Sequence, residues 1–194
     1  MSESGKEQKV KGALMVGLAM VIKAGKDIDW LAMTRLTAQD LQLINRGIMS
    51  SLWYDRELYE RMGEAVYKMI GHNQPEGAFQ FGHGIVAETL LKVYRGPLVS
   101  SDPKGLLAKF AELYGTAWFN FGKAEFTATP EGGVFKVTDP GGLPFGKGFL
   151  CMLKGVFARL VKENQGENVI IDCPEEKLPE GQKITSAVLN IRWE

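Results

Sequence analysis

The chain has 194 residues, of which 45% are hydrophobic and 24% are charged, an average balance for one soluble globular domain. It carries 23 basic and 23 acidic residues, so its formal net charge is zero. A nucleic-acid-binding protein needs an excess of lysine and arginine to displace counterions from phosphates, and we therefore expect no nucleic-acid partner. Cys151 and Cys173 are too few for a disulfide framework, which is typical of a cytoplasmic protein.

The first nine residues are polar, and we expect a flexible N-terminus over residues 1–9, followed by a single domain over residues 10–194. The apolar run from Ala13 to Ile22 is too short to span a membrane. Lys23 follows this run directly and no small-x-small cleavage site is present, which argues against a signal peptide. The run therefore predicts a buried helix.

Helical patterns follow in chain order over residues 37–49, 55–70, 76–94 and 102–118. Thr37 is a good N-cap for the first of them, and Asp102-Pro103 is a strong start for the last. The segment 76–94 is apolar nearly all round, so we expect it to be central and buried.

Two aromatic residues, Trp53 and Tyr54, stand immediately before the helix predicted over 55–70. We expect both of them to anchor the entrance of this helix to the core. The alternative for Trp53 is a place in the wall of a pocket.

The hydrophobic period changes from helical to alternating after residue 122, which predicts a hairpin of strands 123–129 and 134–139. A strongly amphipathic helix follows over 149–161, and two more strands are predicted near 168–173 and 183–193. This order predicts an α+β fold with N-terminal helices packed on a four-stranded antiparallel sheet in β-β-α-β-β order.

The loop GGLPFGKG, residues 141–148, matches the G-x-x-x-x-G-K pattern of phosphate-binding loops. Position 148 is glycine instead of a Mg²⁺-binding Ser or Thr, and Pro144 lacks an N–H group that a phosphate would need. The preceding strand also belongs to a hairpin and not to a parallel sheet. We therefore interpret the segment as a flexible loop and not as a nucleotide site.

The two histidines differ in their predicted settings. His72 stands in a turn, whereas His83 lies in the buried helical segment between Gly82 and Gly84, where each glycine costs about 1 kcal/mol of helix propensity. Glycine there indicates the close approach of another backbone or of a planar ligand. We expect His83 to be a hydrogen-bonded core histidine, with a haem or metal ligand as the alternative.

No catalytic motif is present, and we expect no enzymatic activity, no bound metal and no cofactor. Cys151 stands near the start of a predicted helix, where the helix dipole would lower the thiol pKa and make the thiol reactive. The alternative that we favour is a small buried apolar residue, and we expect both cysteines to remain unbridged.

Six short stretches carry a resemblance through their order and spacing: Val10 to Gly12, Ser51 to Tyr54, Phe81 to Gly84, Trp118 to Gly122, Cys151 to Gly155 and Cys173 to Trp193. Together they resemble a superfamily of small ligand-binding α+β domains, which includes 4-vinyl-reductase-type domains, haem-nitric-oxide-binding sensors and TRAPP trafficking subunits. The likeness is greatest to a paralogous bacterial family of unknown function abundant in myxobacteria.

This resemblance implies a pocket for a small apolar ligand or lipid, located between the buried helix and the sheet. The candidate pocket residues are Trp53, Gly82, His83, Gly84, Trp118, Phe121 and Cys151. The chain also departs from the relatives: it lacks the second cysteine of the final hairpin, the Tyr-x-Ser-x-Arg motif that holds haem propionates, and the early cysteine that carries an acyl chain. A cysteine-based metal role and a haem role are therefore not expected.

These features predict a non-enzymatic, cytoplasmic, sensor-type regulatory domain that binds a small apolar ligand and signals through another protein. A homodimeric interaction module without a ligand is the alternative, because one sheet face cannot cover all the apolar residues of the first helix, among them Leu14, Val16, Leu18 and Met20. A haem-based sensor that uses His83 is a third hypothesis.

Overall fold

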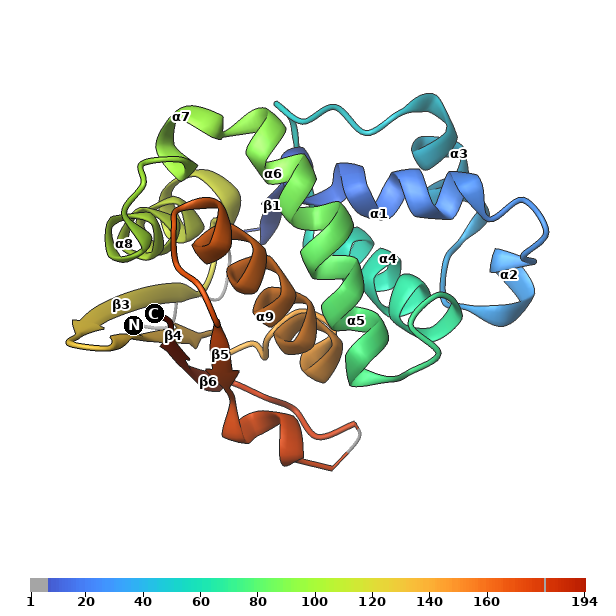
Figure 1. Ribbon diagram of the computed structural model, residues 1–194. Coiled ribbons are helices and arrows are strands. Elements are labelled where there is room, and N and C mark those ends of the chain that lie inside the picture. Colours follow the sequence, from blue (N-terminus) through green and yellow to red (C-terminus); the bar gives the residue numbers. More distant parts are fainter. Residues whose placement is uncertain (1–6, 180) are drawn as a thin grey trace.

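The computed structural model describes residues 7–179 and 181–194, which form an α+β fold (Figure 1). The helices are α1 (Gly12–Ala24), α2 (Trp30–Met33), α3 (Ala38–Arg46), α4 (Arg56–Met69), α5 (Pro75–Phe81), α6 (Ala87–Val93), α7 (Arg95–Leu98), α8 (Pro103–Leu113) and α9 (Gly146–Glu163). The π-helical turns η1 (Gly82–Val86) and η2 (Tyr114–Trp118) and the 3-10 turn η3 (Pro174–Lys177) add to these. The strands are β1 (Lys9–Lys11), β2 (Trp53–Asp55), β3 (Lys123–Thr129), β4 (Gly132–Thr138), β5 (Ile170–Asp172) and β6 (Ser186–Arg192). The α+β class predicted from the sequence is confirmed.

The larger sheet has four antiparallel strands in the spatial order β3-β4-β6-β5. Strands β3 and β4 form the predicted hairpin, with Phe126 opposite Phe135. Strand β6 pairs with β4 on one side and with β5 on the other. A second sheet pairs β1 with β2, with Val10 opposite Tyr54, and the sequence did not predict this sheet.

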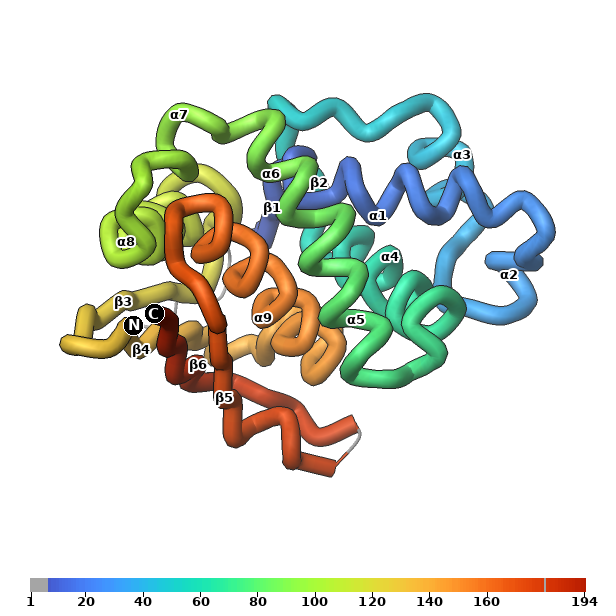
Figure 2. The backbone as a smooth tube through the Cα atoms, in the orientation of Figure 1, coloured from blue at the N-terminus to red at the C-terminus, as the bar shows by residue number. Residues whose placement is uncertain are grey.

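Helices α8 and α9 cover one face of the larger sheet (Figure 1). The rings of Phe110 on α8 and Phe157 on α9 both pack against Phe135 of β4, with centroid distances of 5.9 and 4.6 Å. The segment α5-η1 runs side by side with α9 (Figure 2), and α1 and α4 lie beyond it. The core therefore consists of the sheet, the α8–α9 layer and an outer helical layer.

Two helix starts follow the predicted capping chemistry. The Thr37 side chain accepts a hydrogen bond from the backbone N–H of Asp40, whose carboxylate accepts one from Thr37 in return. The Asp102 carboxylate accepts a hydrogen bond from the N–H of Lys104 at 3.0 Å, and Pro103 occupies the first helical position. The predicted helix over 76–94 is interrupted by η1, so its middle turn is wider than an α-helical turn.

The prediction that Trp53 anchors a helix entrance to the core is wrong. Trp53 belongs to β2 and is 40% exposed, with the ammonium of Lys11 lying 4.8 Å from its ring centroid. Tyr54 is half-buried, and its hydroxyl accepts a hydrogen bond from the N–H of Met49 at 2.9 Å. Pairing with β1 holds this segment, and of the two aromatic residues only Tyr54 packs against the core.

Helix α1 does not need a partner chain to cover it, contrary to the argument for a homodimer. Leu14 and Leu18 are buried by α4, α6 and η1 of the same chain, and Met20 is the one large apolar residue of α1 that is exposed. Strand β1 begins at Lys9, inside the segment predicted to be flexible, of which residues 1–6 lie outside the described residues. No helix in the described part of the chain is long and apolar enough to cross a bilayer.

Candidate functional site

Arg56, the first residue of α4, joins three distant segments of the chain. Its guanidinium contacts the Asp139 carboxylate at 2.8 Å and the Gln8 side-chain oxygen at 2.7 Å, and it donates to the carbonyl of Gly142. Glu60 accepts from its Nε at 2.7 Å. Asp139 is only 1% exposed, so this Arg56 junction is a buried ion pair held by hydrogen bonds.

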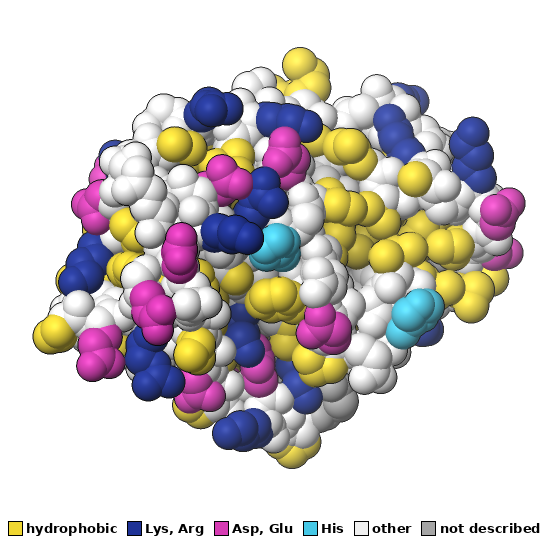
Figure 3. Space-filling view, in the orientation of Figure 1, with side chains coloured by type: hydrophobic (Ala, Val, Ile, Leu, Met, Phe, Trp, Pro, Cys, Tyr) yellow, Lys and Arg dark blue, Asp and Glu magenta, His cyan; other side chains and the backbone are white. Residues whose placement is uncertain are grey.

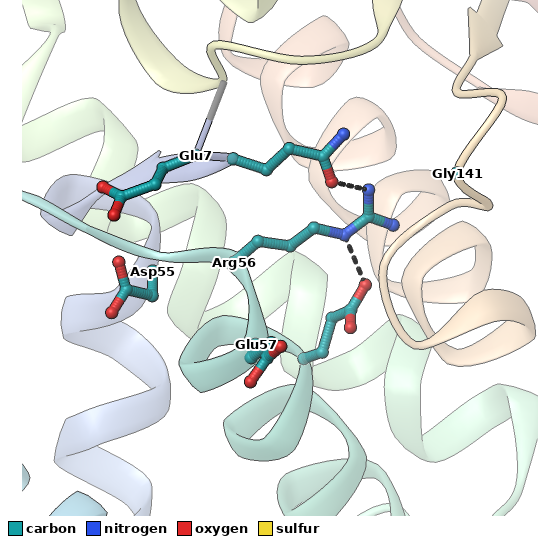
Figure 4. Close-up of a pocket in the computed structure, with 7 residues that line it drawn as sticks. Glu7, Asp55, Arg56, Glu57 and Gly141 are labelled. Carbon is teal, nitrogen blue, oxygen red and sulfur yellow. Dashed lines mark hydrogen bonds and ion pairs between the residues drawn. The ribbon is translucent and has the colours of Figure 1, made fainter. Parts of the chain in front are cut away.

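A groove of about 590 Å³ lies over the Arg56 junction (Figure 4). The guanidinium points toward the loop at Gly141, whereas the carboxylates of Glu7 and Asp55 lie at the other end of the groove. Because the guanidinium nitrogens already have protein acceptors, Arg56 has little capacity left for an anionic ligand. Its role in this geometry is to hold the loop against α4.

The glycine-rich loop, residues 139–148, has no phosphate-binding geometry. It follows an antiparallel strand, and the N–H groups of Gly142, Leu143 and Gly146 all donate to backbone carbonyls of the protein itself. Phe145 precedes α9 with a φ of 34°, in the left-handed region that a bulky residue rarely adopts. The loop therefore presents an aromatic ring instead of a row of free amides.

The Phe145 ring fills an apolar crevice between α1, α4, α5 and α9, which we name the helical crevice. Its wall includes Leu18, Val66, Phe81 and Met152 together with four glycines, Gly63, Gly71, Gly77 and Gly148. A Cβ atom at Gly63 would overlap the Phe145 ring, and one at Gly148 would lie 3.3 Å from it. With the ring in place, the helical crevice keeps only about 10 Å³ of free space, enough for one water molecule at most.

The residues predicted to leave space under the buried helix do not do so. A Cβ atom at Gly82 would overlap the carbonyl oxygen of Met152, because η1 and α9 are in direct backbone contact there. Gly84 faces open space, with no atom within 4 Å of a Cβ position. His83 lies in the wall of an outer groove between α5 and the C-terminal end of α9. Its pKa is lowered by partial burial and then by the charges of Arg159 and Lys162.

The other predicted pocket residues are also dispersed. Trp118 is fully buried, with the ring centroids of Phe110 and Tyr94 at 4.6 and 5.5 Å, so it belongs to a filled core. Phe121 packs under the guanidinium of Arg56, 4.6 Å from its centroid. Trp53 lies at the surface, so the seven residues do not line one cavity.

Both cysteines are free and buried. Cys151 lies inside α9, one turn beyond its start, and burial followed by the nearby Glu176 carboxylate raises the pKa of its thiol to about 12. Burial and then Glu175 raise the pKa of Cys173 to about 12 as well. Among the described residues, no group of three His, Cys, Asp or Glu side chains is arranged to hold a metal ion.

No protein-family model and no curated protein matches the chain. Solved structures of H-NOX proteins are similar along nearly its whole length. A structure from a study of haem distortion in the H-NOX family has a TM-score of 0.62 at 12% identity, covering 95% of each chain. An H-NOX protein from S. oneidensis (TM-score 0.62, 11% identity) and one from K. algicida (0.60, 11%) each cover 95% of this chain, and this chain covers 96% of theirs. The chain has the H-NOX fold.

The interior of this H-NOX fold does not fit haem. Pockets for ligands of this size enclose roughly 300–1,000 Å³ and are largely apolar, whereas the helical crevice has about 10 Å³. The buried Trp118 Nε1 and Tyr114 hydroxyl have no partner, but aromatic rings enclose both, including Phe119 at 4.4 Å from the Tyr114 centroid. Histidine is the axial ligand of haem in globins and peroxidases, and neither histidine here faces the interior, since His72 stands in an exposed turn and His83 in the outer groove.

Sequence reasoning missed Arg56, Asp139 and Phe145. Arg56 stood in an ordinary amphipathic pattern, and Asp139 ended a predicted strand before a glycine-rich loop. The one signal available was Phe145 itself, a bulky aromatic residue in a loop rich in glycine. Such a residue needs a place to bury its ring, and Gly63 and Gly148 in the wall of the helical crevice leave room for it.

Proposed function

We propose that the chain is a non-enzymatic, sensor-type regulatory domain that uses the H-NOX fold without haem and binds a small apolar molecule in the helical crevice. The observation that carries this proposal is the Phe145 ring, seated among glycines at a place where four helices meet. Similarity to haem-binding proteins at 11–13% identity supports the fold, and the filled interior argues against haem as the ligand.

Phe145 has the properties of a displaceable plug. Its positive φ costs of order 1–3 kcal/mol and persists only where the surroundings hold it. Its ring is partly exposed, and it contacts Tyr59 and Phe149 edge-on, with centroid distances of 5.5 and 5.6 Å. A ligand that replaced the ring would meet aliphatic side chains, aromatic rings and glycine backbone, which selects an uncharged apolar molecule with a ring-sized group.

The Arg56 junction links the Phe145 loop to the N-terminal strand, so ligand binding at Phe145 would change contacts at the surface. Arg56 donates to the Gly142 carbonyl and pairs with Asp139, both in the loop that carries Phe145. The same guanidinium contacts Gln8, next to β1. Displacement of Phe145 would therefore alter the contacts between the loop, α4 and the N-terminal strand, and ligand-dependent changes of this kind carry signals in other proteins.

Fluorescence titration with N-phenyl-1-naphthylamine tests the proposal. We expect the wild type to bind the probe weakly and Phe145→Ala to bind it at least tenfold more tightly, because no ring then has to leave the helical crevice. Phe157→Ala is the matched control, since it removes a ring that is enclosed in the core between Phe110 and Phe135. Equal gains in both variants, or no binding to Phe145→Ala, would reject the helical crevice as a binding site.

A second candidate function is protein interaction without a ligand. Four apolar side chains on α1, α2 and the end of α4 are exposed: Met20 (59%), Leu31 (50%), Met33 (47%) and Ile70 (40%). Figure 3 shows hydrophobic side chains gathered on the side of the molecule that carries these helices. Light scattering over a concentration series measures self-association, and a dimer lost in Met20→Glu would favour this candidate.

A further inference from the structure

The segment that leads from α3 into β2, residues 47–53, presents a concentration of apolar side chains at the surface. Met49, Leu52 and Trp53 are 58, 48 and 40% exposed, so this segment holds three of the ten large hydrophobic side chains that are exposed in the described part of the chain. We name these three side chains the apolar tip. The segment runs along the upper rim of the molecule in Figure 2, and hydrophobic side chains protrude at that rim in Figure 3.

Hydrogen bonds hold the backbone of this segment against the start of α1. The N–H of Gly12 donates to the Leu52 carbonyl at 2.8 Å. The N–H of Ala13 donates to the Ser50 carbonyl at 3.1 Å, so the segment satisfies two of the N–H groups that a helix start leaves free. A Cβ atom at Gly12 would overlap the carbonyl oxygen of Met49, because the two backbones are in direct contact there. The apolar tip is therefore carried on a backbone that the fold fixes in place.

Two cations flank the apolar tip. The ammonium of Lys11 lies 4.8 Å from the Trp53 ring centroid, and Arg46 is the last residue of α3, directly before the segment. Neither cation forms an ion pair with a carboxylate in the described part of the chain. No acidic residue stands between Arg46 and Asp55 in the sequence, and Asp55 lies at the other end of the small sheet, opposite Lys9. The charge beside the apolar tip is therefore positive.

The small size of the apolar tip favours a membrane surface over a protein partner. A stable protein interface buries about 800 Å² on each partner and takes roughly 20–30 residues from each side, more than one short segment supplies. Attachment to a bilayer surface needs only a few apolar side chains that enter the headgroup region, with cations beside them for anionic lipids. Tryptophan is enriched at this boundary, because its ring is apolar and its N–H is polar. The composition of the tip and its flanks matches this second case.

We propose that the apolar tip docks the protein on the surface of an anionic lipid bilayer. The three apolar side chains enter the headgroup region, while Lys11 and Arg46 lie against lipid phosphates. Binding then requires both the apolar side chains and anionic lipid, and it weakens as salt screens the attraction between the cations and the bilayer. Residues 47–53 line none of the grooves described above, so this surface is separate from the helical crevice and does not depend on a ligand there.

Co-sedimentation of the whole chain with lipid vesicles tests the proposal. Vesicles of phosphatidylcholine alone are compared with vesicles of an equimolar mixture of phosphatidylcholine and phosphatidylglycerol. We expect the protein to bind the mixed vesicles at least tenfold more tightly than the neutral ones, and sodium chloride to release it. Trp53 is the most exposed of the four tryptophans, so fluorescence emission should shift to shorter wavelength on binding, and the Trp53→Phe variant should bind with little shift.

Leu52→Glu and Leu31→Glu form a matched pair of variants, because both leucines are about equally exposed, at 48 and 50%, and only Leu52 belongs to the apolar tip. Leu52→Glu should weaken binding to the mixed vesicles at least tenfold, whereas Leu31→Glu should bind like the wild type. Circular dichroism verifies that both variants fold. No binding of the wild type to the mixed vesicles, or equal losses in the two variants, would overturn the proposal. Self-association without lipid that Leu52→Glu abolishes would overturn it too, because the tip would then be a contact between two copies of the chain.

Discussion

Gly82 and Gly84 form a matched pair that measures how closely η1 packs on α9. Replacement by alanine adds the same methyl group at both positions and recovers the same helix propensity, roughly 1 kcal/mol. At Gly84 the methyl group meets nothing within 4 Å, so we expect a neutral or stabilising effect. At Gly82 it would overlap the Met152 carbonyl oxygen and lie 3.0 Å from the Met152 Cα, and overpacking of this kind costs roughly 1–3 kcal/mol.

Because the propensity effects cancel, the difference in unfolding free energy between the two variants equals the cost of forcing η1 away from α9. Urea denaturation measures it, and at an m-value of roughly 2 kcal/mol per molar the Gly82→Ala midpoint should lie about 1 M below that of Gly84→Ala. Equal midpoints with unchanged m-values would refute the reasoning, because they would mean that a cavity lies beneath Gly82.

Three other predictions concern the loop and the cysteines. Gly63→Ala should destabilise the wild type but not the Phe145→Ala variant, because the added methyl group would overlap the Phe145 ring. A double-mutant cycle by urea denaturation should give a coupling energy of about 1–3 kcal/mol. Additive effects would mean that the Phe145 ring does not lie against Gly63. Arg56→Ala leaves the Asp139 carboxylate buried and unpaired and should cost about 3–5 kcal/mol, whereas the double variant with Asp139→Asn should recover part of this loss. Both cysteine thiols, with pKa values raised to about 12, should react with Ellman's reagent at pH 8 only after denaturation, and rapid reaction in the native state would contradict their burial.

Features that depend on neighbouring residues in the chain were predictable. Thr37 and Asp102 mark helix starts because a cap needs only the next three residues. The alternation that ends at Thr129 marked the hairpin for the same reason, since both strands flank one turn. Contacts between distant segments were not predictable, and the pairing of β1 with β2 and the Arg56 junction both belong to this kind.

Gly82 shows why the candidate site was placed wrongly under the buried helix. A missing side chain has the same appearance in sequence whether it makes room for a ligand or for another backbone. The deciding fact is the Met152 carbonyl on α9, which no local pattern reveals. Phe145 is the reverse case, because its ring fills a space beside Gly63 of α4 and Gly148 of α9, and Gly63 lies far from Phe145 in the sequence.

The central claim is that this H-NOX fold operates without haem, and a hemin titration of the wild type tests it most directly. The Soret absorbance of hemin shifts and sharpens when a protein side chain coordinates the iron in a defined pocket. With an interior that Phe145, Trp118 and their neighbours fill, we predict no saturable complex. A complex that saturates at one equivalent of hemin and is lost in His83→Ala would contradict the account.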